Sequence, residues 1–245
     1  MSKGKVWCLF EQSGTFKNVI KSYGYEAVDV DICNHYGETD IICNLFTDIW
    51  LASGQTYEEN IFDEISKDDI VLAFFPCIKF TEKIFPNSRC QSSQFKAYST
   101  QKKIEFSRKY MSTICKYYTV FCQLYEVALK LGLRMVIENP YPNLHFLNMF
   151  FPVDSTVKDY NRAEHGDWYK KPTQYWFINI DIPDELREVR GTAKPLATVK
   201  NGNTDVIKGR NYRERRRMIS PKYADWFFRT YILENLSQTK ENKNV

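Results

Sequence analysis

Short apolar runs that alternate with helix-forming segments dominate the first 140 residues of the chain. The runs lie at residues 5–10, 26–31, 69–75 and 134–137, with a weaker one at 40–44. After the first run, apolar residues recur at helical spacing at Phe16, Val19, Ile20 and Tyr23, and Gly24 can end the helix. Strands that alternate with helices are typical of parallel sheets. The sequence therefore predicts an α/β fold with a Rossmann-like, mostly parallel sheet flanked by helices.

Two further segments of the first half can be interpreted from their pattern. Thr56 and Glu59 form a capping-box pattern, which predicts a helix that continues to about Ile65. Residues 79–103 are polar and basic, which indicates a long loop. A helix is expected from about Ile104 to Leu131, and its aromatic stripe indicates packing into the core.

Signals of regular structure become weaker after Pro140. We expect irregular surface as far as Glu164, a strand over residues 174–180 and a loop between residues 183 and 210. Ser220-Pro221 combines a good N-cap with a proline in the first helical turn, which predicts a helix that runs to about Leu236.

Length, charge and cysteine content limit the class of protein. At 245 residues the chain is long enough for one large domain but short for two. Its net charge of +4 permits contact with a polyanion without requiring it. Seven cysteines without a C-x-x-C pair and three scattered histidines argue against a zinc cluster, a disulfide framework or another metal site. The sequence shows neither a membrane span nor a signal peptide, so we expect a cytoplasmic protein with reduced thiols.

A thiol and a carboxylate follow two of the apolar runs. Pro76-Cys77 ends the run at 69–75, and Glu138-Asn139 ends the run at 134–137. Open α/β sheets bind ligands at the carboxyl ends of their strands, so we expect Cys77 and Glu138 to lie at one site. A lone cysteine beside apolar residues is most often structural. The expected position of Cys77 beside Glu138 is what favours a nucleophile. Among the other cysteines, we expect Cys8, Cys43, Cys115 and Cys122 to lie in the core, and Cys33 and Cys90 to lie in loops.

Two features near the first strands are typical of a cofactor site. The turn after the first strand contains Gly14, which lets a backbone approach a ligand, although one glycine is a weak signal. Asp31 ends the second run, where a carboxylate can accept both hydroxyl groups of a ribose. Asp29 lies on the same strand face and remains an alternative for that role.

In this order, the features resemble those of the DNA cytosine-5 methyltransferase family, most closely a compact phage and bacterial branch without a large target-recognition domain. The resemblance covers residues 5–140 and, less completely, residues 165–235. It implies S-adenosylmethionine as the cofactor. The cofactor-binding residues that it implies are Phe10, Ser13, Gly14, Thr15 and Phe16 of the first loop, Asp31 and Ile32 at the ribose, and Asp48 and Ile49 on the adenine side.

The resemblance also implies a mechanism. Pro76-Cys77 with Phe80-Thr81 is similar to the nucleophile motif, and Glu138-Asn139 to the Glu-Asn pair. The Cys77 thiolate would add to carbon 6 of a cytosine flipped out of DNA, and Glu138 would have to carry a proton at neutral pH to donate it to N3. The substrate-binding residues implied are Pro76, Asn139, Lys171, Arg213, Arg215 and Arg216. No side chain is assigned to remove the carbon-5 proton, for which water is plausible.

On this resemblance, residues 1–236 form one methyltransferase domain and residues 237–245 a disordered tail. Within the domain, we expect a cofactor and catalytic core at 1–140, a reduced DNA-contacting region at 141–219 and a C-terminal helix at 220–236. Two segments, 171–176 and 215–221, are similar to late signatures of the compact branch.

The sequence departs from the family pattern at several positions. The second glycine of the cofactor loop is missing, Ile78 replaces a glutamine, and Pro140 replaces a valine. The arginine-rich strand that grips the target base in larger members is not evident, and Lys171 is the best substitute.

The function of the basic segments remains open at this stage. Residues 79–103 are either a loop that clasps a DNA strand or a solvated basic surface. The arginines between 210 and 217 favour a phosphate-binding patch, with structural pairing to acidic residues as the alternative.

Two other functions also remain open. One is a nucleic-acid-binding protein with a degenerate methyltransferase fold. The other, ranked last, is an amino-group methyltransferase, since Asn139-Pro140 faintly resembles the Asn-Pro-Pro-aromatic motif.

Overall fold

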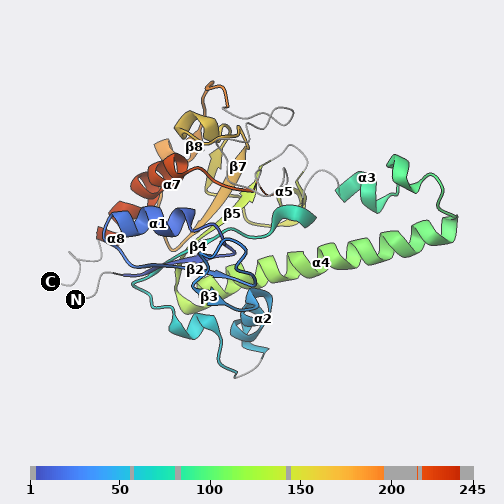
Figure 1. The fold of residues 1–245 in the computed structure, drawn as a ribbon. Helices are drawn as coiled ribbons and strands as arrows, with labels where there is room; N and C mark the ends of the chain where they lie inside the picture. Colours follow the sequence, from blue (N-terminus) through green and yellow to red (C-terminus); the bar gives the residue numbers. More distant parts are fainter. Residues whose placement is uncertain are drawn as a thin grey trace.

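An eight-stranded mixed sheet with helices against it organises the molecule (Figure 1). The computed structural model describes residues 4–55, 58–80, 84–141, 145–195, 214 and 217–237. The strand order is β3-β2-β1-β4-β5-β7-β6-β8. The α/β class and the mostly parallel, Rossmann-like sheet that the sequence predicts are therefore confirmed.

Seven strand pairings hold the sheet together. The strands are β1 (Val6–Leu9), β2 (Ala27–Asp31), β3 (Ile41–Ile42), β4 (Ile70–Ala73), β5 (Arg134–Pro140), β6 (Val157–Asp159), β7 (Thr173–Ile178) and β8 (Glu188–Val189). Neighbours from β3 to β5 are parallel, as are β6 and β8. β7 is antiparallel to both β5 and β6. The order 3-2-1-4-5 is that of doubly wound sheets, whose ligands bind where the strand order reverses, here between β1 and β4.

Helices and single helical turns connect the strands. The α-helices are α1 (Thr15–Ser22), α2 (Leu45–Trp50), α3 (Ile84–Ser88), α4 (Thr100–Leu131), α5 (Phe146–Phe150), α7 (Pro221–Phe227) and α8 (Leu233–Ser237). Shorter 3-10 turns lie at Ile61–Glu64, Cys77–Lys79, Ser93–Phe95, Arg162–His165 and Asp184–Leu186, and π-helical turns at Leu51–Gln55 and Phe228–Ile232.

The ends of the helices follow local rules. The Ser99 hydroxyl caps the start of α4, and Gly132 ends it in the left-handed conformation, with φ of 65°. The Ser220 hydroxyl accepts a hydrogen bond from the Tyr223 backbone, and Pro221 occupies the first turn of α7. The predicted helix end at Leu131 and the predicted helix start at Ser220-Pro221 are confirmed.

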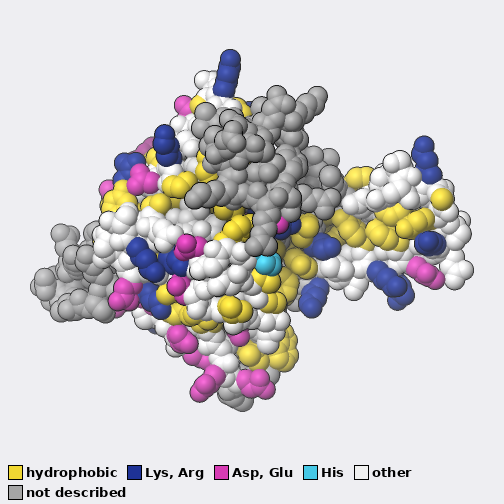
Figure 2. Space-filling view, viewed as in Figure 1, with side chains coloured by type: hydrophobic (Ala, Val, Ile, Leu, Met, Phe, Trp, Pro, Cys, Tyr) yellow, Lys and Arg dark blue, Asp and Glu magenta, His cyan; other side chains and the backbone are white. Residues whose placement is uncertain are grey.

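One part of the chain projects from the body beside the sheet (Figures 1 and 2). It consists of α3, the turn at Ser93–Phe95 and the N-terminal half of α4, and we call residues 84–116 the arm. Helix α4 connects the parallel strands β4 and β5, so it starts at the carboxyl edge of the sheet and runs back along it. The arm therefore extends outward from the carboxyl edge.

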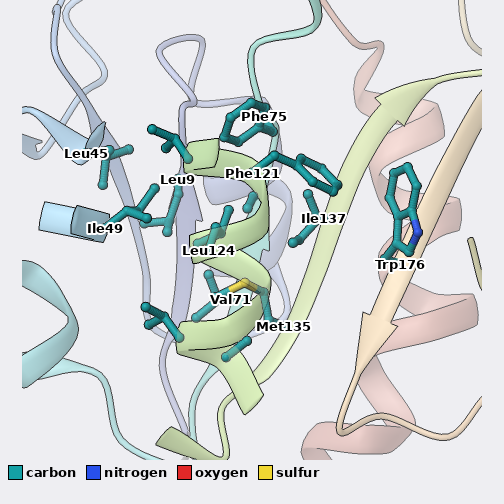
Figure 3. Packing of buried hydrophobic residues seen from close by; sticks show 14 of the residues in the cluster. Leu9, Leu45, Ile49, Val71, Phe75, Phe121, Leu124, Met135, Ile137 and Trp176 are labelled. Atoms are coloured by element: carbon teal, nitrogen blue, oxygen red, sulfur yellow. The ribbon is translucent and has the colours of Figure 1, made fainter. Parts of the chain in front are cut away.

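Alternating side chains of the central strands build a core on each face of the sheet. Trp7, Leu9 and Val71 belong to the cluster under α4, whereas Val6 and Cys8 belong to the cluster under α1 and α7. Figure 3 shows how α4 packs on the first face, with Phe121 and Leu124 turned toward the strands. Because both faces are covered, the polar groups at the strand ends are the accessible part of the sheet.

Several predicted elements are wrong in extent or kind. The capping box is formed by Asn60 and Asp63 and opens a single 3-10 turn, while Thr56 lies outside the described residues. Residues 79–103 are not a continuous loop, because they contain α3 and a 3-10 turn, and α4 starts at Thr100 rather than at Ile104. The expected irregular surface up to Glu164 contains α5 and β6, and the expected loop after Pro183 contains β8. Elements of two to six residues are too short to show a hydrophobic period in the sequence, so this pattern cannot predict them.

Two cysteines also differ from expectation. Cys115 is exposed on α4 rather than in the core, and Cys90 is buried in the arm rather than free in a loop. Cys90 is enclosed because its thiol lies 3.6 Å from the Lys103 carbonyl oxygen of α4.

Among the described residues, no helix combines the length and the apolar content needed to cross a membrane. Within the same ranges, His, Cys, Asp and Glu side chains do not form a group of three that could hold a metal ion.

Candidate functional site

A pocket of about 490 Å³ opens at the carboxyl ends of β1, β2, β4 and β5. It lies at the reversal of strand order between β1 and β4, the usual ligand position in such sheets. Its volume is within the range of about 300–1,000 Å³ found for small-molecule sites. The lining residues that sequence analysis had selected are Phe10, Ser13, Asp31, Pro76, Cys77, Glu138 and Lys171.

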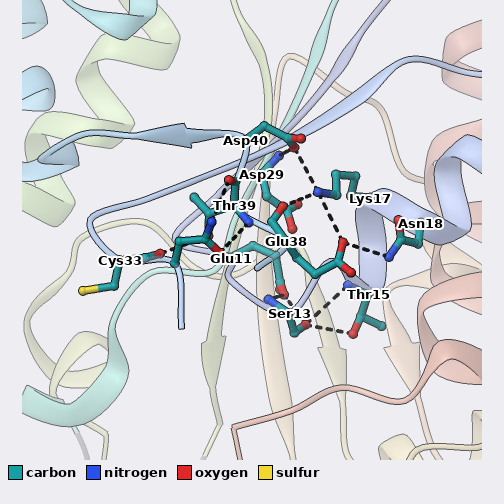
Figure 4. Close-up of polar contacts among 11 residues, drawn as sticks. Glu11, Ser13, Thr15, Lys17, Asn18, Asp29, Cys33, Glu38, Thr39 and Asp40 are labelled. Carbon is teal, nitrogen blue, oxygen red and sulfur yellow. Dashed lines mark hydrogen bonds and ion pairs between the residues drawn. The ribbon is translucent and has the colours of Figure 1, made fainter. Parts of the chain in front are cut away.

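The loop after β1 forms one wall of the pocket. Phe10 adopts a left-handed conformation with φ of 60°, and Gly14 follows with φ of 69°. The buried Glu11 carboxylate accepts hydrogen bonds from the Ser13 backbone, at 2.7 Å, and from the Ser13 hydroxyl (Figure 4). The Ser13 hydroxyl also lies 2.8 Å from that of Thr15. These bonds fix a tight turn between β1 and α1 at the cavity wall.

Gly14 is needed for reasons of space as well as conformation. A Cβ atom there would lie 2.6 Å from Glu38 Oε2 and 2.9 Å from Asn18 Nδ2. Its neighbours are therefore Asn18 of α1 and Glu38 of the loop between β2 and β3. Gly14 is not among the residues that line the pocket.

Two carboxylates of β2 were candidates for the ribose, and only Asp31 faces the pocket. Asp31 Oδ1 accepts hydrogen bonds from Gln12 Nε2 and the Cys33 backbone, both at 2.9 Å. Burial raises the pKa of Asp31, while these hydrogen bonds oppose the rise. Asp29 is completely buried beside Glu11 and Lys17, and burial raises its pKa to about 8.

Cys77 begins the 3-10 turn that follows β4, directly after Pro76. Burial raises the pKa of the Cys77 thiol, Lys171 lowers it, Glu138 raises it and Arg217 lowers it. The net shift is upward. The thiol is therefore protonated at neutral pH in this state of the protein, and the two cations are the groups that favour the thiolate.

Asn139 connects the thiol-bearing loop to β5. Its side-chain amide donates a hydrogen bond of 3.0 Å to the Phe75 carbonyl oxygen, two residues before Cys77. Asn139 is fully buried and does not line the pocket. The structure therefore gives Asn139 a positioning contact between the two strand ends.

Glu138 lies in β5 with its carboxylate facing the pocket and two cations beside it. Its Oε1 atom is 3.6 Å from Arg162 Nη1 and 3.9 Å from Lys171 Nζ. β7 pairs Thr173 with Pro140, so Lys171, two residues earlier, emerges beside the carboxyl end of β5. The Glu138 carboxyl group therefore has two cationic neighbours at the pocket wall.

Arg162 is a site residue that sequence analysis missed. Its guanidinium is fully buried, 2.5 Å from Asp167 Oδ2 and 4.4 Å from the centre of the Tyr223 ring. Burial opposes the charge, but Asp167 raises the pKa of Arg162, which stays protonated. Only the pairing of β6 with β7 brings Arg162 to Glu138, and no local pattern marks it. An arginine between two aspartates, Asp159 and Asp167, is the one weak signal in the sequence.

The segment before α7 covers the pocket from the other side. Arg217, Met218 and Ile219 line it together with Glu214. These residues belong to the late segment that resembles a signature of the compact methyltransferases. Arg210, Arg213, Arg215 and Arg216 lie outside the described residues, as does Thr81.

The remaining predicted cofactor residues do not line the pocket. Phe16 is buried under α7, against Phe227, and Ile49 is buried under α4. Thr15 supports the Ser13 hydroxyl, Ile32 is exposed, and Asp48 lies in α2, a helix that sequence analysis did not predict. The structure thus brings the Phe10–Ser13 turn, Asp31, Cys77, Glu138 and Lys171 together at the cavity. The predicted site residues that lie outside the cavity are Gly14, Thr15, Phe16, Ile32, Asp48, Ile49 and Asn139.

Fold and pocket together define an α/β protein with a Rossmann-like sheet and a polar pocket at its carboxyl edge. When the chain is compared with known proteins, no protein-family model matches it and no curated protein matches it. The function has to be inferred from the chemistry of the pocket.

Proposed function

We propose that the protein transfers a methyl group from S-adenosylmethionine to carbon 5 of cytosine in DNA, by way of a covalent Cys77 adduct. One observation carries the proposal: a single cavity is lined both by three of the nine predicted cofactor residues, Phe10, Ser13 and Asp31, and by the predicted catalytic pair. The two groups come from strand ends separated by up to 128 positions, between Phe10 and Glu138. Their meeting in one pocket is what a two-substrate transfer requires.

The chemistry of the lining fits S-adenosylmethionine. Asp31 presents a carboxylate for the ribose hydroxyl groups, and Phe10 presents an aromatic ring for the adenine. The Glu11 carboxylate lies at the same wall, where it can attract a cationic amino or sulfonium group. When bound, the cofactor supplies an electrophilic methyl group.

Cys77 would act as the nucleophile. Its thiol loses a proton, and Sγ adds to carbon 6 of the cytosine, while the displaced ring electrons make carbon 5 nucleophilic. Lys171 and Arg217 favour the thiolate, so bound DNA phosphate that recruits either cation would alter the reactivity of Cys77. Once carbon 5 has taken the methyl group, removal of its proton, which we assign to water, allows the Sγ–C6 bond to break. The thiolate then returns, and N3 gives its proton back to Glu138.

Glu138 would deliver a proton to N3 as negative charge develops on the ring. Arg162 and Lys171 would then stabilise the carboxylate that remains, since both lie within 4 Å of Oε1 by the distances above. Asn139 would hold Glu138 and Cys77 in fixed relative positions through its hydrogen bond to the Phe75 carbonyl oxygen.

The test uses duplex DNA that contains 5-fluorocytosine, which cannot lose a proton from carbon 5 and so retains the adduct. With S-adenosylmethionine, the wild type should form a denaturation-resistant complex of protein and DNA, and Cys77→Ser should form none. Cys122→Ser is the matched control, because Cys122 is a half-buried thiol of α4 outside both the pocket and the arm, and it should trap DNA like the wild type. Trapping by Cys77→Ser, or none by the wild type, contradicts the proposal.

A second candidate is a nucleic-acid-binding protein that has lost catalysis. The raised pKa of the Cys77 thiol favours this alternative, because a protonated thiol is a poor nucleophile. DNA binding without trapping would support it.

Asp31→Ala tests the cofactor half of the proposal. Loss of hydrogen bonds between the Asp31 carboxylate and the ribose should weaken S-adenosylmethionine binding by about 1–3 kcal/mol. Isothermal calorimetry measures the change. Asp184→Ala, a change to an exposed carboxylate outside the pocket, is the control. Equal affinity of wild type and Asp31→Ala would remove Asp31 from the cofactor site.

A further inference from the structure

The arm is a strongly basic part of the chain. Residues 84–116 contain seven lysines and arginines and a single acidic residue, Glu105. This surplus of six exceeds the surplus of four for the whole chain, so the other residues together carry a net charge of −2. One projecting element thus carries a surplus of six positive charges (Figure 2).

The cations of the arm are not neutralised by neighbouring carboxylates. Arg89, Lys96, Lys102, Arg108, Lys109 and Lys116 are exposed, and none of them forms an ion pair within the described part of the chain. Elsewhere, exposed arginines such as Arg190 and Arg229 are paired with nearby acids. Three of the lysines, 102, 109 and 116, recur every seven residues and thus form one stripe along α4, with steps of about 10 Å.

Most of the arm lies outside the core that an amphipathic helix normally joins, and its contacts with the core cluster are made by Ile84, Tyr110, Met111 and Ile114. None of residues 100–113 is buried, and the first buried side chain of α4 is Ile114. An isolated helical segment of this length is marginally stable in water. A small aromatic cluster stabilises this part of α4 instead. The centre of the Phe106 ring lies 4.7 Å from that of Phe95 and 5.7 Å from that of Tyr110. The basic stripe is thus held on a rigid support rather than on a mobile loop.

The position of the arm connects it to the pocket. The arm leaves the carboxyl edge of the sheet, at which the pocket opens. Lys79, two residues after Cys77, lies 5.6 Å from the centre of the Tyr110 ring, at the base of the arm. The base of the arm therefore lies beside the turn that carries Cys77.

We propose that the arm is the main docking surface for duplex DNA, with the lysine stripe of α4 contacting the phosphate backbone. This inference deepens the proposed function, because it assigns a recognition surface to a chain without a large target-recognition region. Duplex DNA carries about one charge per 1.7 Å of its axis, so lysines spaced along a straight helix find phosphates without a specific register. Binding through the stripe is accordingly expected to depend on salt and little on sequence.

Fluorescence anisotropy with a short labelled duplex, without cofactor, tests the inference over about 50–200 mM salt. The triple variant Lys102→Ala, Lys109→Ala, Lys116→Ala should bind about tenfold more weakly or worse, and lower the salt slope by up to about three. Alanine favours exposed helix, so the variant should keep its helical circular dichroism. The matched control replaces three exposed lysines at the amino edge of the sheet, Lys21, Lys67 and Lys130, with alanine and should bind like the wild type.

Equal affinity and salt slope for the wild type and the stripe variant would overturn the inference, and so would equal weakening by the control. Arm-dependent binding of single-stranded RNA but not of the duplex would overturn the choice of DNA. Because the assay contains neither S-adenosylmethionine nor 5-fluorocytosine, its outcome is separate from that of the trapping experiment. Stripe-dependent binding without trapping would support the docking surface and reject the catalytic proposal.

Discussion

Side chains at the pocket divide into those that face the cavity and those that hold them in place. Cys77 and Glu138 could be predicted because each directly follows or ends an apolar run, and a strand end is visible in sequence. Arg162 could not, since its importance arises from three contacts made across the sheet, to Glu138, Asp167 and Tyr223. Asn139 was predicted as a site residue, but its contact with Phe75 required the structure.

Glu138→Gln should slow methyl transfer about 10²–10⁴-fold, because a glutamine cannot donate the acidic proton to N3. Single-turnover kinetics measure the rate, and a thermal melt reports folding. Glu164→Gln is the control, since Glu164 is an exposed carboxylate that accepts a hydrogen bond from the Ala193 backbone outside the pocket. A Glu138→Gln rate within about threefold of the wild type would show that no acid acts there.

Asp29 predicts a pH dependence of folding. Its folded pKa of about 8 lies above the ordinary value of 3.8, so the folded protein retains a proton that the unfolded chain releases. This group therefore makes the free energy of unfolding fall as pH rises from about 4 to about 8. Asp29→Asn should raise the melting temperature, and more so at pH 8 than at pH 5. Asp181→Asn, an exposed control, should give no such difference, and an equal gain at both pH values for Asp29→Asn would contradict the assignment.

At the scale of elements, α4 combines two structures in one helix. Its C-terminal half packs Phe121 against Phe75, Phe80 and Trp176, whereas its N-terminal half belongs to the arm. The stripe of this helix, from Met111 to Ala128, predicts core packing, and this is confirmed, because its members belong to the core cluster or pack against it. Before the stripe, Phe106 packs against Phe95 of the arm instead. Periodicity identifies an apolar face but not what covers it, so a face closed by the Phe95 cluster has the same pattern as one closed by the sheet.

Phe121→Ala should destabilise the protein by about 3–5 kcal/mol, because the residue is fully buried among aromatic rings. Phe106→Ala should leave the global melting temperature almost unchanged and weaken only the arm. Hydrogen exchange separates the two effects, since Phe106→Ala should speed exchange in residues 100–113 alone. Global unfolding of the Phe106 variant would show that the arm and the body form one cooperative unit.

At the scale of the whole molecule, the pocket depends on both ends of the chain. The cluster under α1 contains Phe16 and Val6 from the first strand–helix unit together with Tyr223 and Phe227 of α7. Tyr223 also donates a hydrogen bond of 2.8 Å to Asp159 and lies under Arg162. The C-terminal helices therefore close one face of the sheet and support the site at once.

Residues 1–140 alone should fail to fold cooperatively, because the truncated chain exposes the face that α7 covers. Circular dichroism melts should show no sigmoidal transition for it. A chain of residues 1–237 keeps every member of both clusters and is the control, with a melt like that of the full chain. A cooperative transition for residues 1–140 would show that the first five strands form an independent domain.

The arm is one continuous stretch whose two ends, Ile84 and Ile114, belong to the same hydrophobic cluster of the body. Everything between these anchors lies outside the sheet, and none of the residues that line the pocket comes from it. The arm is therefore structurally separate from the pocket. We expect that another helical segment can replace most of the arm and so change what the protein binds, while the pocket keeps its lining, provided that Tyr110 and Met111, which pack against the body, are retained.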